Sequence, residues 1–411
     1  MHIDINQFFA AATILLEPSL KNKPLIIAGS SRRGIVSTAS YEARKYGIHS
    51  AMPTYMAKKL CPNVIIRPVN FEWYNQKSHE FFSFIEENYT KKIEKASIDE
   101  CYVDMTDLMK DITDPLKYLK ELQDNLYKNT LLQVSIGIGP TKFLAKMGSD
   151  YKKPMGITII RKKDIKRILY PLPIDDFFGI GKKTCPKLKE IGINTIGDFA
   201  VSDSYKVKEI MGKFYFTAKK WVNGEGDDVV ENTPFDPKSI SSTTTLLYDS
   251  SDYEEIKKII EQKSHEIALT AKQDKKIGKT ITLILKDASF KSITRSVTIE
   301  KPTNDFIDIY TSVMKLFDKF FTNQSIRLVG VGLSQLMNTD EFYVQISLFN
   351  QVQEQKECYT KLLINKLNRK ANKKLFTIAS DVKKDKDGIW RCFRMFFNIL
   401  CSWKRIIKTN N

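Results

Sequence analysis

The sequence predicts an α+β protein of several domains, and three observations lead to this fold class. The chain has 411 residues, more than one ordinary hydrophobic core organises, so we expect two to four domains. Up to about residue 160, strand-like runs alternate with helical segments. After a helical, glycine-punctuated stretch, strands and helices alternate again, which favours two α+β domains with a helical unit between them.

The first 160 or so residues predict one sheet and its helices. Residues 1–7 indicate a short strand that ends at Asp4, residues 8–16 a helix, and residues 24–28 a second strand. A strand over 35–38 leads into a helix near 41–46, for which Ser37, Thr38 or Ser40 is available as the N-cap. Further along, we expect helices near 75–88 and 115–128, and strands near 93–98, 101–105 and 134–138.

The remainder predicts a helical unit, a linker and a second α+β domain. Residues 161–233 have a helical pattern, and the prolines of segment 234–240 mark a linker. Beyond it, residues 241–341 form the second domain. We expect its helices near 252–273 and 304–321, and strands near 281–286, 293–299, 326–335 and 342–348.

The charge of the chain indicates a polyanionic partner. The net charge is +17, which favours nucleic acid first and an acidic membrane surface second. Residues 350–411 hold 15 Lys and Arg against 5 Asp and Glu, so the C-terminal tail, 351–411, is strongly basic. Its uncharged stretch 395–403 is too short to span a bilayer, and a packed helix, a membrane surface, a protein partner and DNA stay open for it.

Cysteine and histidine usage excludes two site classes. Six cysteines include no C-x-x-C pair, and four histidines are scattered, so we expect neither a zinc site nor a disulfide framework. The first apolar run, 8–16, follows an acidic residue and lacks a cleavage pattern, so it is a poor signal peptide. We therefore expect a cytoplasmic location without stable membrane insertion.

Three carboxylates are placed to meet on the predicted sheet. Asp4 ends one strand, and Asp99 and Glu100 stand between two others. Such a cluster suits a pair of Mg²⁺ ions in phosphoryl transfer. Neighbouring residues of a regular strand face opposite sides, so Asp99 and Glu100 share a site only at a bend. Taken alone, an acidic pair between strands is more typical of a solvated turn than of a catalytic site.

Several motifs in one order resemble the Y family of DNA polymerases. They are His2–Ala10, Ser37–Gly47, Ala96–Asp104, Gly137–Gly139, Lys142–Lys146 and Lys153–Gly156. The resemblance covers about residues 1–385 and is strongest before 200. It implies a right-hand polymerase with a ferredoxin-like palm (1–7 and 70–160), small fingers (8–69), a helix-hairpin-helix thumb (161–233) and a little finger (241–341).

This resemblance also implies the activity. We expect a template-directed DNA polymerase that adds dNTPs to a primer 3′ end and carries out error-prone synthesis across DNA lesions. We also expect it to lack proofreading and to act as a monomer. Asp4, Asp99 and Glu100 are the implied catalytic residues, and with the Ile5 carbonyl they are the implied ligands of two Mg²⁺ ions.

For the nucleotide, the resemblance implies Phe8, Phe9, Tyr41, Arg44 and Lys153, with Phe9 as the steric gate against a ribose 2′-hydroxyl. A three-residue spacing puts Tyr41 and Arg44 on one helix face. The alternatives are a core-packing pair at Phe8 and Phe9 and an ordinary solvated helix face at Arg44.

For DNA and the clamp, other segments are implied. Gly179, Gly181 and Lys182 resemble a hairpin that binds backbone phosphates, although a tight turn needs the same glycines. Lys286, Lys291 and Arg295 are the expected little-finger contacts, with plain surface charge as the alternative. Segment 342–350, with Gln345, Leu348 and Phe349, resembles a sliding-clamp peptide, and an alternating edge strand has a similar pattern.

Departures from the family pattern leave rivals open. Asn6 stands where the family commonly has a second acid, and Phe178 replaces the usual proline of the hairpin. A nucleotidyl cyclase-like enzyme, a catalytically silent DNA- and clamp-binding scaffold, and a partner-dependent mutagenesis polymerase subunit are the alternatives.

Overall fold

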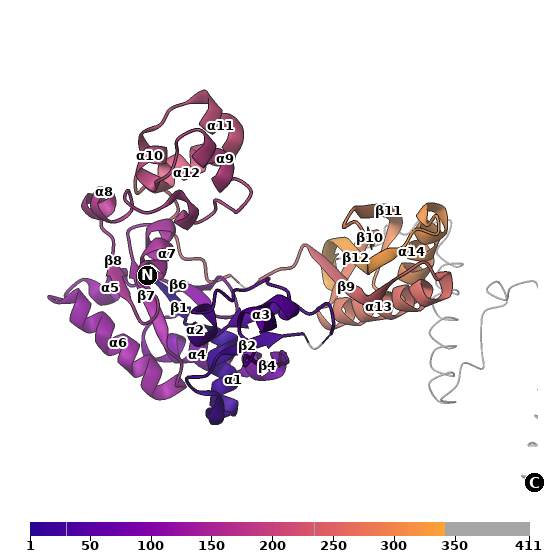
Figure 1. Ribbon diagram of the computed structural model, residues 1–411, viewed down its shortest axis with the longest axis horizontal. Helices are drawn as coiled ribbons and strands as arrows, with labels where there is room; N and C mark the ends of the chain where they lie inside the picture. The colour runs from indigo at the N-terminus through magenta and orange to yellow at the C-terminus, as the bar shows by residue number, and fades with distance from the viewer. Residues whose placement is uncertain (30, 234, 342–411) are drawn as a thin grey trace, which may run out of the picture. The chain divides into compact units, whose positions relative to one another are not determined.

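The computed structural model describes residues 1–29, 31–233 and 235–341. The chain divides into a unit of residues 1–274 and 278–336 and a second unit of residues 275–277 and 337–411. The predicted strand 342–348, the clamp peptide with Gln345, Leu348 and Phe349, and the basic tail lie outside the described residues. Figure 1 labels most of the helices and strands along the chain.

The first sheet has five strands in the order β5-β6-β1-β7-β8. Its strands are β1 (His2–Ile5), β5 (Ile93–Lys95), β6 (Glu100–Val103), β7 (Val134–Ile138) and β8 (Ile157–Ile159). β1 is antiparallel to both β6 and β7, and β8 is added parallel to β7. The order β7-β1-β6-β5 is that of the ferredoxin-like split βαβ plan.

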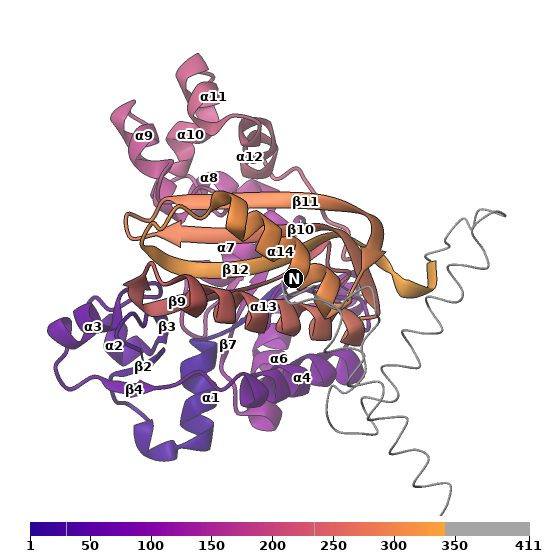
Figure 2. The ribbon, with the colours of Figure 1, turned by 90° about the vertical axis from the view of Figure 1, so that its right-hand side faces the viewer.

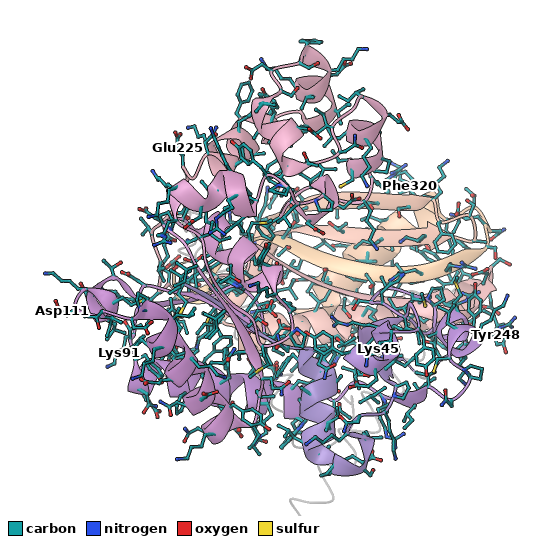
Figure 3. All side chains as sticks on the ribbon, turned by 60° about the vertical axis from the view of Figure 1, so that its left-hand side comes forward. Lys45, Lys91, Asp111, Glu225, Tyr248 and Phe320 are labelled. Carbon is teal, nitrogen blue, oxygen red and sulfur yellow. The ribbon has the colours of Figure 1, made fainter. Side chains whose placement is uncertain are left out.

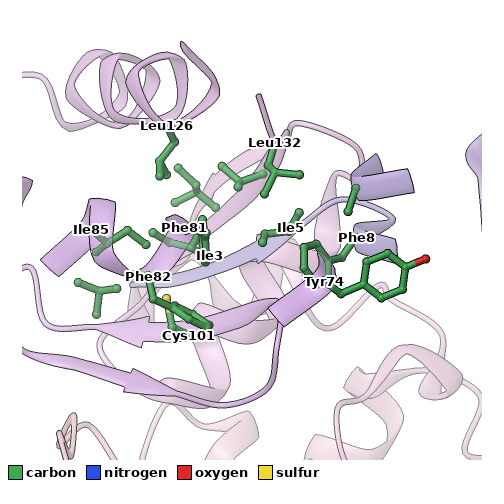
Figure 4. Packing of buried hydrophobic residues seen from close by; sticks show 14 of the residues in the cluster. Ile3, Ile5, Phe8, Tyr74, Phe81, Phe82, Ile85, Cys101, Leu126 and Leu132 are labelled. Atoms are coloured by element: carbon green, nitrogen blue, oxygen red, sulfur yellow. The ribbon is translucent and has the colours of Figure 1, made fainter. Parts of the chain in front are cut away.

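The two faces of this sheet have different partners because side chains alternate along a strand. Ile3 and Ile5 belong to a hydrophobic core with α4 (Phe71–Asn88) and α6 (Pro115–Thr130), as Figure 4 shows around Phe81 and Leu126. On the other face, His2 and Asp4 contact α7 (Lys142–Tyr151). A short helix, α5 (Thr106–Met109), follows β6.

Helix α7 lies very close to β7 at a glycine. A Cβ on Gly137 would come within 2.0 Å of the Ala145 carbonyl oxygen and 2.2 Å of the Ser149 nitrogen. Gly137 therefore permits the close approach that places the Lys146 side chain over the sheet.

A small three-stranded sheet, β3-β2-β4, holds residues 18–67 together with short helices. Its core members include Ile26, Val36 and Ala43. Ser40 caps the helix after β3, since its hydroxyl accepts a hydrogen bond from the Ala43 nitrogen. The elements are α1 (Phe8–Leu16), η1 (Pro18–Leu20), β2 (Leu25–Ala28), β3 (Val36–Ala39), α2 (Tyr41–Arg44), α3 (Thr54–Leu60) and β4 (Ile65–Arg67).

The predicted helical unit is present, and in the sequence it lies between the strands of the five-stranded and the four-stranded sheet. Its core includes Phe177, Leu188 and Phe199, all fully buried. A capping box of Thr195 and Asp198 begins α10. The elements are η2 (Lys162–Asp164), α8 (Ile165–Ile168), η3 (Ile174–Asp176), α9 (Cys185–Glu190), α10 (Ile196–Val201), α11 (Tyr205–Met211) and α12 (Phe214–Val222).

A second sheet, in the order β11-β10-β12-β9, forms the last described domain. Its elements are β9 (Ser239–Ser250), α13 (Tyr253–Gln273), β10 (Lys276–Asp287), β11 (Ser292–Thr303), α14 (Phe306–Phe320), β12 (Ile326–Asn338) and η4 (Thr339–Glu341). Figure 2 shows α13 and α14 beside the strands. The core formed with these helices includes Leu283, Val313 and Val331.

Strand β9 was not among the predicted strands, and it begins inside the segment predicted as a linker. Its Ser- and Thr-rich start has little hydrophobic alternation, so it was missed. Pairing with β12 forms it, with Thr243 opposite Gly330 and Ser241 opposite Gly332.

Candidate active site

Three carboxylates come together at one end of the first sheet. Asp4 of β1 is directly opposite Glu100 of β6 in the antiparallel register. The Ile5 nitrogen donates a hydrogen bond to the Asp99 carbonyl at 2.9 Å, which joins the residue before β6 to the same strand. Residues 97–99 form a bend, so Asp99 and Glu100 escape the strict alternation of a regular strand.

Two lysines lie among these carboxylates. The Lys146 Nζ is 2.6 Å from Glu100 Oε2 and 3.2 Å from Asp4 Oδ2. The Lys153 Nζ is 2.7 Å from Asp4 Oδ1 and 2.8 Å from Asp150 Oδ1. Asp4 is therefore paired on both oxygens, which a buried carboxylate requires.

Burial and charge shift the protonation equilibria of the cluster. Burial raises the pKa of Asp4, but the ammonium groups of Lys153 and Lys146 outweigh it, so the pKa lies below its ordinary value. Burial raises the pKa of Asp99 and that of Glu100, and the charge of Asp4 raises both further. Carboxylates with perturbed pKa values are typical of functional sites.

The donor set suits a hard divalent cation. Carboxylate oxygens are the ligands that Mg²⁺ prefers, and Asp4, Asp99 and Glu100 supply them from adjoining strand ends. Within residues 1–29, 31–233 and 235–341, no three His, Cys, Asp or Glu side chains are arranged as a ligand set. In this structure the ammonium groups of Lys146 and Lys153 pair with the carboxylate oxygens instead.

Phe9, in the first turn of α1, packs on a well-defined aromatic neighbour. Its ring stacks on Tyr74 at 4.4 Å between centroids, with an interplanar angle of 10°. Thr13 donates its hydroxyl hydrogen to the Phe9 carbonyl at 2.7 Å and lies 2.8 Å from the Tyr74 hydroxyl, which is then the donor. By contrast, Phe8 is 2% exposed within the core, so its side chain packs inside rather than facing a nucleotide.

Tyr41 and Arg44 share one face of α2, as the three-residue spacing predicts. The Arg44 guanidinium lies 4.9 Å from the centroid of the Tyr41 ring. Among the described residues, the buried Tyr41 hydroxyl is one of the few polar atoms without a hydrogen-bond partner. Burial raises the pKa of Tyr41, against the charges of Arg44 and Lys153. An unpaired hydroxyl beside cationic side chains suits an incoming phosphate oxygen.

Residues without an assigned role in the sequence analysis also build the site. Gln7, in the left-handed region at φ 46°, accepts a 2.6 Å hydrogen bond from the Tyr41 nitrogen through Oε1. Asn6 is buried and bonds Ser135 and the Met155 nitrogen, so it ties β1 to its neighbours. Lys146 belongs to the Lys142–Lys146 motif, but that motif gave no indication that the Lys146 side chain contacts the carboxylates.

The His2 imidazole lies next to the Glu100 carboxylate. Ser149 donates its hydroxyl hydrogen to the Lys146 carbonyl, so the His2 Nδ1, 2.8 Å from Ser149 Oγ, is the donor to that serine. The His2 Nε2 then carries a lone pair 3.5 Å from Glu100 Oε2. Burial, followed by the charge of Lys146, lowers the pKa of His2 from 6.5 to about 3.

The predicted DNA contacts of the helical unit lie in a turn before α9. Gly179 has φ +98°, and a Cβ there would meet the Phe214 ring at 2.6 Å. Gly181 has open space around its Cα, so its backbone is accessible, and Lys182 is exposed. This arrangement leaves backbone and charge available for a phosphate.

The second sheet separates the three cations predicted to contact DNA. Leu283 pairs with Arg295 and is buried against the helices, so Arg295 points to the helix-covered side. Its guanidinium lies 4.8 Å from the centroid of the Phe320 ring, and Phe320 is labelled in Figure 3. Lys286 alternates to the opposite face, and Lys291 is exposed in the following turn. We therefore leave Arg295 out of the proposed DNA contacts.

Family comparisons agree with this arrangement. A model of the impB/mucB/samB family matches residues 3–150, and a model of its C-terminal domain matches residues 237–348. A model of the IMS family HHH motif matches residues 162–193. DNA polymerase IV of Bacillus velezensis is 37% identical over 387 residues, which are 93% of this chain and 93% of that relative.

The chain belongs to the Y family of DNA polymerases. DNA polymerase IV of Clostridium kluyveri, another relative, is 36% identical over 94% of this chain and 98% of its own length. This membership confirms the resemblance carried by the sequence motifs.

Solved structures of Y-family polymerases confirm the predicted fold class. A chimera of the polymerases Dbh and Dpo4 matches with a TM-score of 0.72 and 26% identity, covering 82% of this chain and 98% of that one. An insertion ternary complex of Dbh DNA polymerase matches with a TM-score of 0.59 at 26% identity and the same coverage. The expected fold class, a right-hand polymerase with palm, fingers, thumb and little finger, is thus confirmed. None of the helices in the described part of this Y-family chain is both long and apolar enough to cross a bilayer.

Proposed function

We propose that this Y-family chain is a DNA-directed DNA polymerase for translesion synthesis, with its active site at Asp4, Asp99 and Glu100. The observation that carries the proposal is the register that puts Asp4 opposite Glu100, with Asp99 in the adjoining bend. Relatives of near-full-length similarity are named DNA polymerase IV, which supports the same activity.

The carboxylates of Asp4, Asp99 and Glu100, with the Ile5 carbonyl, would hold two Mg²⁺ ions. When bound, such ions lower the pKa of a primer 3′-hydroxyl and neutralise the charge of the triphosphate and the leaving pyrophosphate. The protein supplies the positions: β1 and β6 hold the acids on adjacent strands, and α7 covers them from one side.

Other side chains orient the nucleotide. Tyr41 offers its unpaired hydroxyl, while Arg44 and Lys153 offer positive charge to the phosphates. The Phe9 ring, stacked on Tyr74, would occupy the space that a ribose 2′-hydroxyl needs. Deoxynucleotides are selected because this stacking prevents Phe9 from turning aside.

DNA would be held without reading its sequence. In the thumb, the turn at Gly179, Gly181 and Lys182 contacts backbone phosphates. In the little finger, the face opposite the helices is rich in hydroxyl groups, and Lys286 lies on it. Its members include Thr243, Thr245, Thr280, Thr282, Ser296 and Thr298. Hydroxyls and lysines are typical phosphate contacts.

Primer extension by the purified chain tests the proposal. We expect extension with dNTPs and Mg²⁺ on intact templates and past an abasic site. Asp99→Asn, which removes charge but keeps shape, lowers the extension rate at least about a thousandfold, since it removes a ligand that acts in the transition state. Asp111→Asn, at an exposed palm acid, is the matched control and retains wild-type extension.

The alternatives predict different results. A silent scaffold binds primer-template but never extends it, and a cyclase-like enzyme consumes a nucleoside triphosphate without primer. A partner-dependent subunit extends only when its partner is added. A clamp contact at Gln345, Leu348 and Phe349 predicts that alanines there reduce extension on clamp-loaded primers and leave extension without clamp unchanged.

A further inference from the structure

Lys146 is the most enclosed cation of the active site. Its side chain is 10% exposed, and its ammonium nitrogen has three carboxylate neighbours. They are Glu100 at 2.6 Å, Asp4 at 3.2 Å and Asp150 at 3.4 Å. An ammonium has three hydrogens, so it can serve all three acids from one position.

Asp4 and Glu100 need such a cation when no metal is bound. They are opposite each other across two strands, where side chains are only about 5 Å apart. Asp4 is buried and Glu100 is partly buried, so two like charges at that spacing repel more strongly than they would in water. Lys146 bridges them, so it keeps both carboxylates in place on the sheet.

The same contacts compete with a divalent cation. Any ion that uses Asp4 Oδ2 and Glu100 Oε2 takes the two oxygens that Lys146 now occupies. Asp150 lies one helical turn further along α7 and is more open, at 41% side-chain exposure. It also pairs with Lys153 at 2.8 Å, so it is the shared acceptor for both lysines of the site.

We propose that Lys146 is a positioning residue that holds Asp4 and Glu100 together before metal binding and moves onto Asp150 when divalent cations take those carboxylates. This inference rests on the proposed function, because it concerns the same carboxylates. It assigns Asp150 a role as well: the acid that receives the displaced ammonium and so makes the exchange less costly.

The proposal predicts opposite changes at two positions. Lys146→Met keeps the length and apolar stem but removes the competing charge, so half-saturation occurs at a roughly tenfold lower divalent concentration. Asp150→Asn leaves Lys146 with only Asp4 and Glu100, and Lys153 with only Asp4, so half-saturation requires an approximately threefold higher concentration. Lys146→Arg keeps the charge and stays close to wild type.

The experiment measures Mn²⁺ binding to the purified full chain by the loss of the electron paramagnetic resonance signal of free Mn²⁺. The specific component of Mn²⁺ binding is defined as the binding that is lost in Asp4→Asn. Thermal unfolding in EDTA and in saturating Mn²⁺ is the second readout. Lys142→Met is the matched control, because Lys142 lies on the same helix but pairs with Glu94 at 2.7 Å.

Opposite shifts in the two variants, with Lys142→Met unchanged, support the proposal. A lower unfolding temperature of Lys146→Met in EDTA, recovered by Mn²⁺ more fully than in wild type, also supports it. Unchanged half-saturation in folded Lys146→Met and Asp150→Asn overturns it while the metal site stands. Absence of any specific component in wild type instead overturns the proposed metal site, and this inference with it.

Discussion

Replacement of Gly137 by alanine should disturb the active site indirectly, because it would push helix α7 away from strand β7. A Cβ at this position would lie 2.0 Å from the Ala145 carbonyl oxygen and 2.2 Å from the Ser149 nitrogen, both in the backbone of α7. Ordinary contacts between such atoms need more than about 3 Å, so β7 and α7 must separate by roughly 1 Å. Neither contact is with a flexible side-chain end that can turn away.

This separation has a calculable effect on Lys146, which α7 carries. Its 2.6 Å contact with Glu100 would lengthen to about 3.6 Å, beyond hydrogen-bond range. We expect the free energy of unfolding to fall by about 1–3 kcal/mol, the usual cost of overpacking. Primer extension should fall by about a hundredfold, the effect typical of a 1 Å misplacement in an active site.

Urea denaturation and single-turnover extension measure the two effects. Gly148→Ala is a graded control, because its Cβ would be 3.0 Å from the Gly137 Cα and 3.1 Å from the Thr158 oxygen. Gly181→Ala is a control for the stability measurement only, because a Cβ at Gly181 would have no atom within 4 Å. The loss of stability should follow the order 137, 148, 181. A Gly137→Ala chain as stable as wild type would refute the close packing of α7 on β7.

Three further predictions concern pH, sugar selection and DNA binding. Because burial keeps His2 neutral in the folded chain, with its pKa lowered from 6.5 to about 3, only the unfolded chain takes up a proton just below pH 6.5. Stability therefore falls as pH drops through this window, by about 2 kcal/mol between pH 6.5 and pH 5. Denaturation curves should show that His2→Gln loses this contribution while His79→Gln, at an exposed position, retains it. Phe9→Ala should raise the ratio of ribonucleotide to deoxynucleotide insertion at least about tenfold in single-nucleotide assays, and an unchanged ratio would show that Phe9 is not the gate. Lys182→Ala should reduce the slope of log Kd against log salt by roughly 1, whereas Arg295→Ala, stacked on Phe320, should leave it unchanged.

Much of the architecture was available from local sequence pattern. Hydrophobic spacing predicted α4, α6 and β7, and glycines and prolines marked the turns between regions. The bend that Asp99 and Glu100 require was also predictable, since adjacent strand residues cannot otherwise share a site. Motifs in one order identified the family, because each motif combines residue type with spacing.

Contacts between distant segments were not predictable in this way. Lys146 is 142 residues from Asp4, and only the packing of α7 on Gly137 brings them to 3.2 Å. Strand β9 lacks a hydrophobic alternation of its own, and its hydrogen bonds to β12 create it. Arg295 has the composition of a DNA contact, but its register with Leu283 directs it to the helix-covered face.

The sequence by itself determined which chemical groups are present, where many of the helices and strands lie, and which family the chain belongs to. These properties depend on side-chain type and short-range spacing, which are local. Only the tertiary structure decided which acids share a lysine, which ring supports Phe9 and which strand face stays open. Those properties depend on register and helix packing, where a shift of one residue reverses the direction of every side chain on a strand.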